Sequence, residues 1–283
     1  MTMRTTLVSI PTDTAPLDGA YYEPEGGAAR GVALLFHGNT MNFYQGAPRF
    51  LPPVLTKLGL ACLAFNRRGH DILSTRDSRA PEGGAFQLTS AAIADNRTAA
   101  AWLGARGFAD PLVIGHSNGG MLAVRHVADH PHTPALVLLS AHRGGRELVP
   151  RASGTGLFAA DRLEEVTAEA RKLVAAGRGD ELMLLPGWWH VVSAATFVDL
   201  LSELPDVLAL APAIRCPVLY LRGDQEPADL YPAEDFKARA TGACTVEIVP
   251  NCGHFYVGRE EAVAATVATW LARTLRLSPA SPA

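Results

Sequence analysis

Short apolar runs alternate with longer amphipathic stretches along most of this chain. Apolar runs of strand length, bounded by turn residues, are typical of strands buried on both faces of a sheet. Alternating strands and helices imply a parallel sheet with helices on both faces. The strands are predicted at 31–36, 61–65, 111–116, 135–140, 218–221 and 245–249, and the helices near 50–58, 88–107, 118–129, 232–239 and 260–275. Residues 6–10 and 19–22 are expected to form an N-terminal hairpin.

The alternation stops between residues 142 and 213 and then resumes. No strong strand pattern occurs in this block, whereas 159–176 and 193–204 have the periodicity of amphipathic helices. We therefore predict one α/β core built from 1–141 and 214–277. Residues 142–213 form a helical cap inserted into it, and 278–283 form a disordered tail.

Composition narrows the class of protein further. Among the 283 residues, 48% are hydrophobic and 19% are charged, which excludes a disordered chain. A net charge of -3 gives no basic footprint for nucleic acid or an anionic membrane. No secretory signal or membrane-length apolar run is visible, so a cytoplasmic location is expected. The four cysteines form no CxxC pair, and neither a metal nor a cofactor is expected.

The sharpest motif is Gly115-His-Ser-Asn-Gly119, a G-x-S-x-G that lies between a predicted strand and a predicted helix. A strained turn at this place exposes the serine as a nucleophile, and its glycines allow close packing against neighbouring elements. Alone, the motif would also fit a glycine-rich turn with a solvent-facing serine. Its strand–turn–helix context makes Ser117 the candidate nucleophile.

A serine needs a base, and the base needs an acid that fixes its tautomer. His254 follows the last predicted strand and is the candidate base. Asp224 follows the strand at 218–221 and is the candidate acid, with Glu226 as the alternative. Catalytic groups on parallel sheets gather at the carboxyl edge of the strands, where all of these residues are expected.

An oxyanion formed during acyl transfer needs N–H donors that are already in position. The backbone N–H of Asn118, the residue after the nucleophile, is one candidate donor. The loop after the strand at 31–36 supplies the other, at Asn39. Gly38 would let this loop pass close to the serine, and His37 is expected to support the loop by hydrogen bonds.

Together these motifs resemble the α/β-hydrolase superfamily over about residues 31–275. They include Phe36-His-Gly, Gly115-His-Ser-Asn-Gly-Gly120, Leu221-Arg-Gly-Asp224 and Gly253-His254, in the order nucleophile, acid, base. The resemblance implies a mostly parallel eight-stranded sheet flanked by helices, with block 142–213 as a lid. It implies a serine hydrolase acting on a carboxylic ester, thioester or lactone of a small molecule. A C–C bond hydrolase, a cofactor-free lyase and a non-catalytic ligand-binding protein remain alternatives, because fold does not settle the reaction.

The substrate pocket is the part that the sequence indicates least clearly. Apolar and aromatic residues of the cap and of the loop after the first core strand are candidates for its lining, although they could equally form the core of the cap. These candidates are Met41, Tyr44, Met183, Trp188, Trp189 and His190. Arg67, Arg68, His70 and Asp71 are expected to form a structural knot of hydrogen bonds and ion pairs, with recognition of a substrate carboxylate as the alternative. The sequence leaves a homodimer open.

Overall fold

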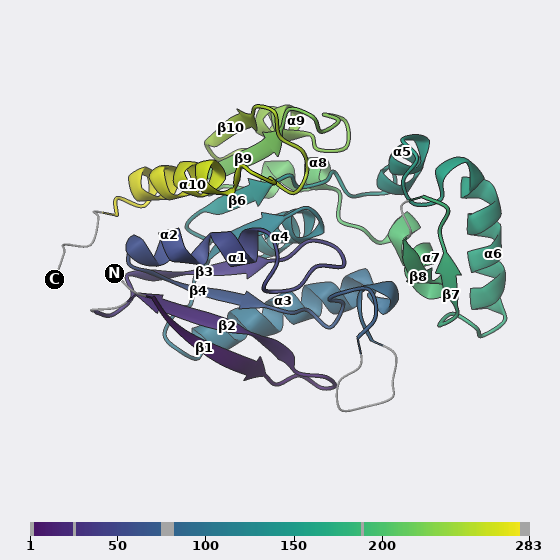
Figure 1. The fold of residues 1–283 in the computed structure, drawn as a ribbon, viewed down its shortest axis with the longest axis horizontal. Coiled ribbons are helices and arrows are strands. Elements are labelled where there is room, and N and C mark those ends of the chain that lie inside the picture. Colours follow the sequence, from purple (N-terminus) through teal and green to yellow (C-terminus); the bar gives the residue numbers. More distant parts are fainter. Residues whose placement is uncertain (1–2, 25–26, 75–81, 188–189, 278–283) are drawn as a thin grey trace.

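The computed structural model describes residues 3–24, 27–74, 82–187 and 190–277. The predicted tail at 278–283 lies outside the described residues. An eight-stranded sheet forms the centre of the molecule, with the strand order β1-β2-β4-β3-β5-β6-β9-β10 (Figure 1). Its strands are β1 (Met3–Ile10), β2 (Leu17–Pro24), β3 (Gly31–Phe36), β4 (Leu60–Phe65), β5 (Leu112–His116), β6 (Leu136–Leu139), β9 (Val218–Gly223) and β10 (Cys244–Val249).

Only β2 runs against its neighbours, pairing antiparallel with both β1 and β4. The other pairs from β4 to β10 are parallel. The predicted N-terminal hairpin and the mostly parallel sheet are both confirmed. Parallel strands place their carboxyl ends at one edge, and the loops that leave β3, β5, β6, β9 and β10 therefore meet there.

Helices cover both faces of the sheet, as the continuous apolar runs predict. Along β3, Val32, Leu34 and Phe36 pack in one buried cluster, while Ala33 and Leu35 pack in the cluster on the other face. The first cluster includes residues of α3 (Thr89–Gly104), α4 (Asn118–Asp129), α8 (Val207–Leu210) and α9 (Ala233–Arg239). The second includes residues of α1 (Ala47–Phe50), α2 (Pro52–Lys57) and α10 (Glu260–Thr274).

The inserted block lies beyond one end of the sheet, at the right of Figure 1. Its elements are α5 (Leu148–Gly154), η2 (Ala160–Arg162), α6 (Leu163–Ala175), β7 (Leu182–Leu184), β8 (Val191–Ser193) and α7 (Ala194–Ser202). They enclose a small core of their own around Val166, Met183 and Phe197. The predicted all-helical block is thus corrected: β7 and β8 form a two-stranded antiparallel sheet within it. Three-residue strands are too short to give a periodic signal.

A side chain of the cap joins it to the start of α3. Leu88, the residue before α3, offers no side-chain cap to the helix. Instead, Asp199 of α7 accepts hydrogen bonds from the backbone N–H and the hydroxyl of Thr89, at 2.9 and 2.6 Å. A carboxylate at a helix N-terminus satisfies free N–H groups and is favoured by the helix dipole. The contact therefore ties α7 to the start of α3.

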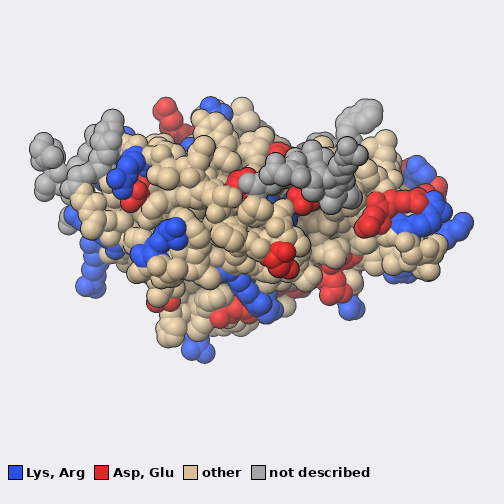
Figure 2. All heavy atoms as spheres, turned by 90° about the horizontal axis from the view of Figure 1, so that it is seen from below, with Lys and Arg blue, Asp and Glu red and all other residues tan. Residues whose placement is uncertain are grey.

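Acidic and basic side chains are mixed over the face shown in Figure 2, including the end formed by the cap. Two pairs on the cap, Arg162 with Glu165 and Arg178 with Glu181, are ion pairs between neighbouring residues. Within the described ranges, no helix has the length and apolar character needed to cross a membrane.

Candidate active site

Ser117 lies in a sharp turn between β5 and α4, with φ 57° and ψ -120°. This left-handed conformation is strained for a residue with a side chain and presents Ser117 at the carboxyl edge of the sheet. A Cβ at Gly115 would overlap the backbone of Gly119, and one at Gly119 would overlap the carbonyl of Phe36. The glycines of the motif are therefore required by packing, as the sequence predicted.

His254 lies beside Ser117, on the loop between β10 and α10. Its Nε2 is 2.9 Å from Ser117 Oγ, and its Nδ1 is 2.7 Å from Glu226 Oε1. The second contact places the imidazole proton on Nδ1, which leaves Nε2 free to accept the serine proton. Ser117, His254 and Glu226 thus form a continuous chain of hydrogen bonds.

The prediction that Asp224 bonds to His254 is wrong. Asp224 is the first residue after β9, and its carboxylate accepts the backbone N–H groups of Asn251 and Cys252 at 2.9 and 3.0 Å. Those bonds, which lower the pKa of Asp224, hold the loop that carries His254. The carboxylate on the imidazole belongs instead to Glu226, the alternative that the sequence offered, two residues further along.

Glu226 is held from three sides and is only 6% exposed. Its Oε2 accepts hydrogen bonds from Ser140 Oγ at 2.6 Å and from the backbone N–H of Gly223 at 2.7 Å. Burial acts to raise the pKa of Glu226, but hydrogen bonds from His254, Ser140 and Gly223 outweigh it and leave the pKa below its usual value. The carboxylate is therefore ionised at neutral pH.

Two residues that line the cavity of the serine have backbone N–H groups with no protein acceptor among the described residues. Among the described residues, neither the N–H of Asn39 nor that of Asn118 donates a hydrogen bond to protein. Both residues line the cavity that contains Ser117. A Cβ on Gly38 would come within 3.4 Å of Ser117 Cβ, so this loop does pass close to the nucleophile.

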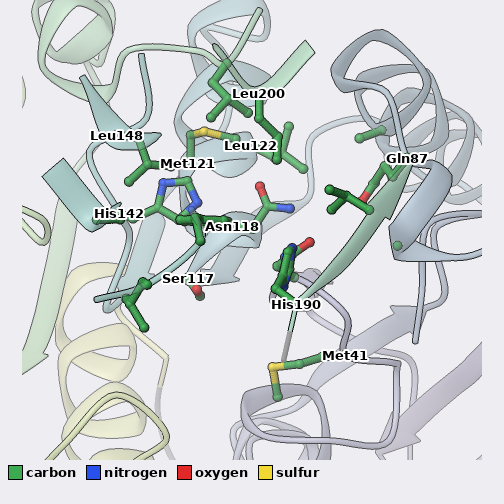
Figure 3. A pocket seen from close by; sticks show the side chains of 18 of the residues that line it. Met41, Gln87, Ser117, Asn118, Met121, Leu122, His142, Leu148, His190 and Leu200 are labelled. Atoms are coloured by element: carbon green, nitrogen blue, oxygen red, sulfur yellow. The ribbon is translucent and has the colours of Figure 1, made fainter. Parts of the chain in front are cut away.

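A cavity of about 280 Å³ lies between Ser117 and the cap. Figure 3 looks into this cavity, with Ser117 and His142 on one side and Gln87 on the other. Much of its wall is apolar, from both α4 and the cap. The main apolar contributors are Met121, Leu122, Leu148, Leu157, Phe158, Val192, Leu200 and Leu204. The sequence did not identify these residues as pocket lining, because an apolar residue at each position is equally typical of the core of a helix layer or of the cap.

Of the six predicted pocket residues, Met41 and His190 do line the cavity. Tyr44 does not: it is 60% exposed, with the guanidinium of Arg49 over its ring, because the loop turns its side chain outward. Met183 does not either, since it packs in the cap's own core. Trp188 and Trp189 lie outside the described residues.

Two further histidines bring neutral polar groups to this region. Burial lowers the pKa of His190 to about 4, and burial, together with the nearby His254, lowers the pKa of His142 to about 3. Both line the cavity as uncharged imidazoles at neutral pH. His116, within the serine motif, has a pKa lowered to about 4 by burial and by His254, and its Nε2 donates to the backbone carbonyl of His254 at 2.9 Å.

The structural knot after β4 is confirmed. Arg67 is fully buried and donates to the carbonyl of His37 at 2.7 Å, while the Arg67 backbone N–H donates to His37 Nε2 at 3.1 Å. Arg68 pairs with the buried Asp95. Neither arginine lines the cavity, so neither is placed to recognise a substrate there. Across the described ranges, no group of three or more His, Cys, Asp or Glu residues is arranged to hold a metal ion.

Comparison with known proteins shows the family of the chain. Residues 33–266 match the model of the alpha/beta hydrolase family, and the chain therefore belongs to that family. A search of curated protein sequences finds no significant match.

Solved structures share the fold at low sequence identity. Est1E from Butyrivibrio proteoclasticus superimposes with a TM-score of 0.71 at 16% identity, over 95% of this chain and 99% of that one. A thermostable carboxyl esterase from Bacillus coagulans gives 0.71 at 15% identity, over 97% and 100%. A dienelactone hydrolase from Anabaena variabilis gives 0.59 at 19% identity, over 96% and 98%.

Proposed function

We propose that this protein is a serine hydrolase that cleaves the carboxylic ester, thioester or lactone of a small to medium-sized, largely apolar molecule. The observation that carries the proposal is the hydrogen-bond chain Ser117–His254–Glu226 at the edge of a mostly apolar cavity. A hydroxyl, an imidazole and a carboxylate in this sequence are the groups that activate a serine for acyl transfer.

The proposed reaction proceeds through an acyl-enzyme. Ser117 Oγ attacks the scissile carbonyl while His254 Nε2 takes the hydroxyl proton. Glu226 orients the imidazole and stabilises the imidazolium, and the N–H groups of Asn39 and Asn118 bind the oxyanion. His254 then passes its proton to the leaving alcohol, thiol or ring oxygen. A water activated by the same imidazole attacks the acyl-enzyme and releases the acid.

The structural relatives support this reaction class. They include a carboxyl esterase and a dienelactone hydrolase, and Est1E has been crystallised with ferulic acid bound. Their identities to this chain are below 20%, so they support an ester or lactone bond in general terms and leave the substrate to be found.

The experiment is turnover of short-chain p-nitrophenyl esters by the purified protein and by Ser117→Ala. We expect Ser117→Ala to lower kcat by roughly three to six orders of magnitude, because the remaining groups cannot replace the nucleophile. Ser9→Ala, on an exposed strand serine, is the matched control and keeps full activity. Undiminished turnover by Ser117→Ala would contradict the mechanism. A fluorophosphonate that fails to label Ser117 in the active protein would favour a lyase that uses His254 alone.

A further inference from the structure

The cavity beside Ser117 is mostly apolar, and the polar side chains in its wall are amides, hydroxyls and imidazoles. Among its described lining residues there is no lysine, arginine, aspartate or glutamate. Burial keeps the imidazoles of His142 and His190 neutral by lowering their pKa values. A charged group entering this space would lose its hydration without gaining an ion pair. The lining thus favours uncharged ligands.

Gln87 stands out among these polar groups. It lies between η1 (Gly84–Phe86) and α3 and lines the cavity opposite Ser117 and His142 (Figure 3). Its Nε2 is buried and has no hydrogen-bond partner among the described residues. Buried amide groups are nearly always paired in folded proteins, so an unpaired one that lines a cavity is a candidate contact for a ligand.

The backbone of a neighbouring loop holds this side chain in place. The three atoms nearest to a Cβ built on Gly69 are Cβ, Cγ and Cδ of Gln87, and all of them would overlap it. The stem of Gln87 therefore occupies space that only a glycine at position 69 leaves open. Because the stem is confined, the amide is oriented before any ligand binds, which reduces the entropy lost on binding.

Apolar side chains also line the cavity that the serine shares with this amide. Leu122 of α4 and Leu200 of the cap line the same cavity, and both lie above Asn118 in Figure 3. A carbon chain or ring would contact these leucines, and a polar atom at its far end would meet the Gln87 amide. An amide offers two N–H donors and a carbonyl acceptor, so it can pair with a hydroxyl or with a carbonyl oxygen.

We propose that Gln87 determines substrate specificity by hydrogen-bonding an uncharged oxygen on the part of the substrate remote from the scissile carbonyl. The substrate class is then a neutral ester or lactone that carries an apolar segment and a distal hydroxyl or carbonyl group. This inference rests on the proposed esterase activity and adds to it the chemistry of the group that is recognised.

The test uses matched esters that differ only in the distal group. The acyl series is p-nitrophenyl hexanoate, its ω-hydroxy analogue and the p-nitrophenyl monoester of adipic acid, with the same set repeated at octanoate length. An alcohol series places a methyl, a hydroxyl or a carboxylate at the far end of the alcohol in butyrate esters, followed by acid release. The readout is the ratio of kcat/KM for the hydroxyl ester to kcat/KM for the methyl ester. This ratio is independent of the amount of folded enzyme.

Gln87→Met keeps the length of the side chain but removes its hydrogen-bonding amide. We expect it to lower the hydroxyl-to-methyl ratio about 5- to 10-fold in at least one series, the effect of losing one hydrogen bond. Gln45→Met, on an exposed glutamine, is the matched control and leaves the ratio unchanged. Gly69→Ala should lower the ratio in the same direction, because its Cβ displaces the Gln87 stem while the amide itself is retained.

The wild-type enzyme should also hydrolyse the hydroxyl ester at least about a hundredfold faster, in kcat/KM, than the carboxylate ester. An unchanged hydroxyl-to-methyl ratio in Gln87→Met, in both series and at both lengths, overturns the role of Gln87. Equal rates on the hydroxyl and carboxylate esters overturn the selection for neutral substrates. Neither result contradicts the proposed esterase activity. That proposal fails only if no ester is hydrolysed or if Ser117→Ala retains the activity.

Discussion

At the scale of single residues, the position of His254 depends on groups that never touch a substrate. Glu226 receives hydrogen bonds from the imidazole, from Ser140 and from the backbone of Gly223. Ser140 has φ 46°, a conformation that turns its hydroxyl toward Glu226 and the Tyr256 hydroxyl. A carboxylate with this many donors keeps both its charge and its orientation.

Ser140→Ala removes one of these donors without changing the triad itself. We expect kcat to fall about tenfold, because the Glu226 carboxylate loses a charge-assisted hydrogen bond and gains freedom to turn from His254. KM should change little, since Ser140 does not line the cavity. Steady-state kinetics checks the prediction. A rise in KM with an unchanged kcat would contradict it. Ser9→Ala again serves as the control.

The nucleophile and the base could be predicted from residue types and their order, but the acid could not. Two carboxylates lie two positions apart after β9, and both are at the correct edge of the sheet. Which one meets His254 depends on how the loop after Gly223 turns and on the longer side chain of Glu226, neither of which leaves a periodic signal. The Asp224 carboxylate instead bonds to the backbone that carries His254.

At the scale of elements, the strained turn before α4 and the contact between α7 and α3 define the site. The strands β3, β4, β5, β6 and β9 and the span of α4 were predictable, because buried strands and a long amphipathic helix leave strong patterns. The two short strands of the cap left none. The hydrogen bonds between Asp199 of the cap and Thr89 of the core could not be predicted from the sequence either, because the two residues are 110 positions apart.

Asp199→Ala tests this connection between cap and core. Removing a helix-capping carboxylate should cost about 1 kcal/mol of unfolding free energy, which lowers Tm by about 2 °C in a chain of this size. Activity should fall as well, because Thr89 lies in the cavity wall. Differential scanning calorimetry and ester turnover measure the two effects. The exposed cap residue Asp180→Ala is the control, and equal stability of the two variants would contradict the role of Asp199.

At the scale of the whole molecule, buried neutral histidines make stability depend on pH. Burial lowers the pKa values of His116, His126 and His190 to about 4, with His254 and His130 adding to the effect at the first two. An unfolded histidine takes up a proton near pH 6.5, whereas these three take one up only near pH 4 in the fold. The unfolded state therefore binds more protons between these values, and stability falls as the pH falls through that window.

The expected slope is about 1.4 kcal/mol per pH unit for each of the three histidines between roughly pH 6 and pH 4. Thermal unfolding followed by circular dichroism from pH 7.5 to pH 4.5 should show a steadily decreasing Tm. His126→Leu removes one buried histidine that does not line the cavity and should make this slope shallower. A Tm that stays level across the range would show that these side chains are not held neutral by burial.

The apolar, uncharged cavity is also a property of the whole molecule. Its lining comes from the sheet edge, from α4 and from the cap, so its members share no sequence pattern. That is why Met183 and Tyr44, both reasonable candidates by residue type, lie in the cap core and on the surface instead. Nothing in the sequence pattern indicated Gln87 as a pocket residue. Its side chain occupies its position in the cavity wall only because Gly69 has no Cβ.

The most direct test of the account compares Glu226→Gln with Asp224→Asn, each an isosteric loss of one carboxylate charge. The account predicts that Glu226→Gln lowers kcat by roughly two to four orders of magnitude, because the amide can neither fix the His254 tautomer nor stabilise the imidazolium. Asp224→Asn should lower kcat less than about tenfold, since it weakens only the loop that carries His254. A large loss in Asp224→Asn together with near-normal turnover in Glu226→Gln would contradict the arrangement of Ser117, His254 and Glu226 described above.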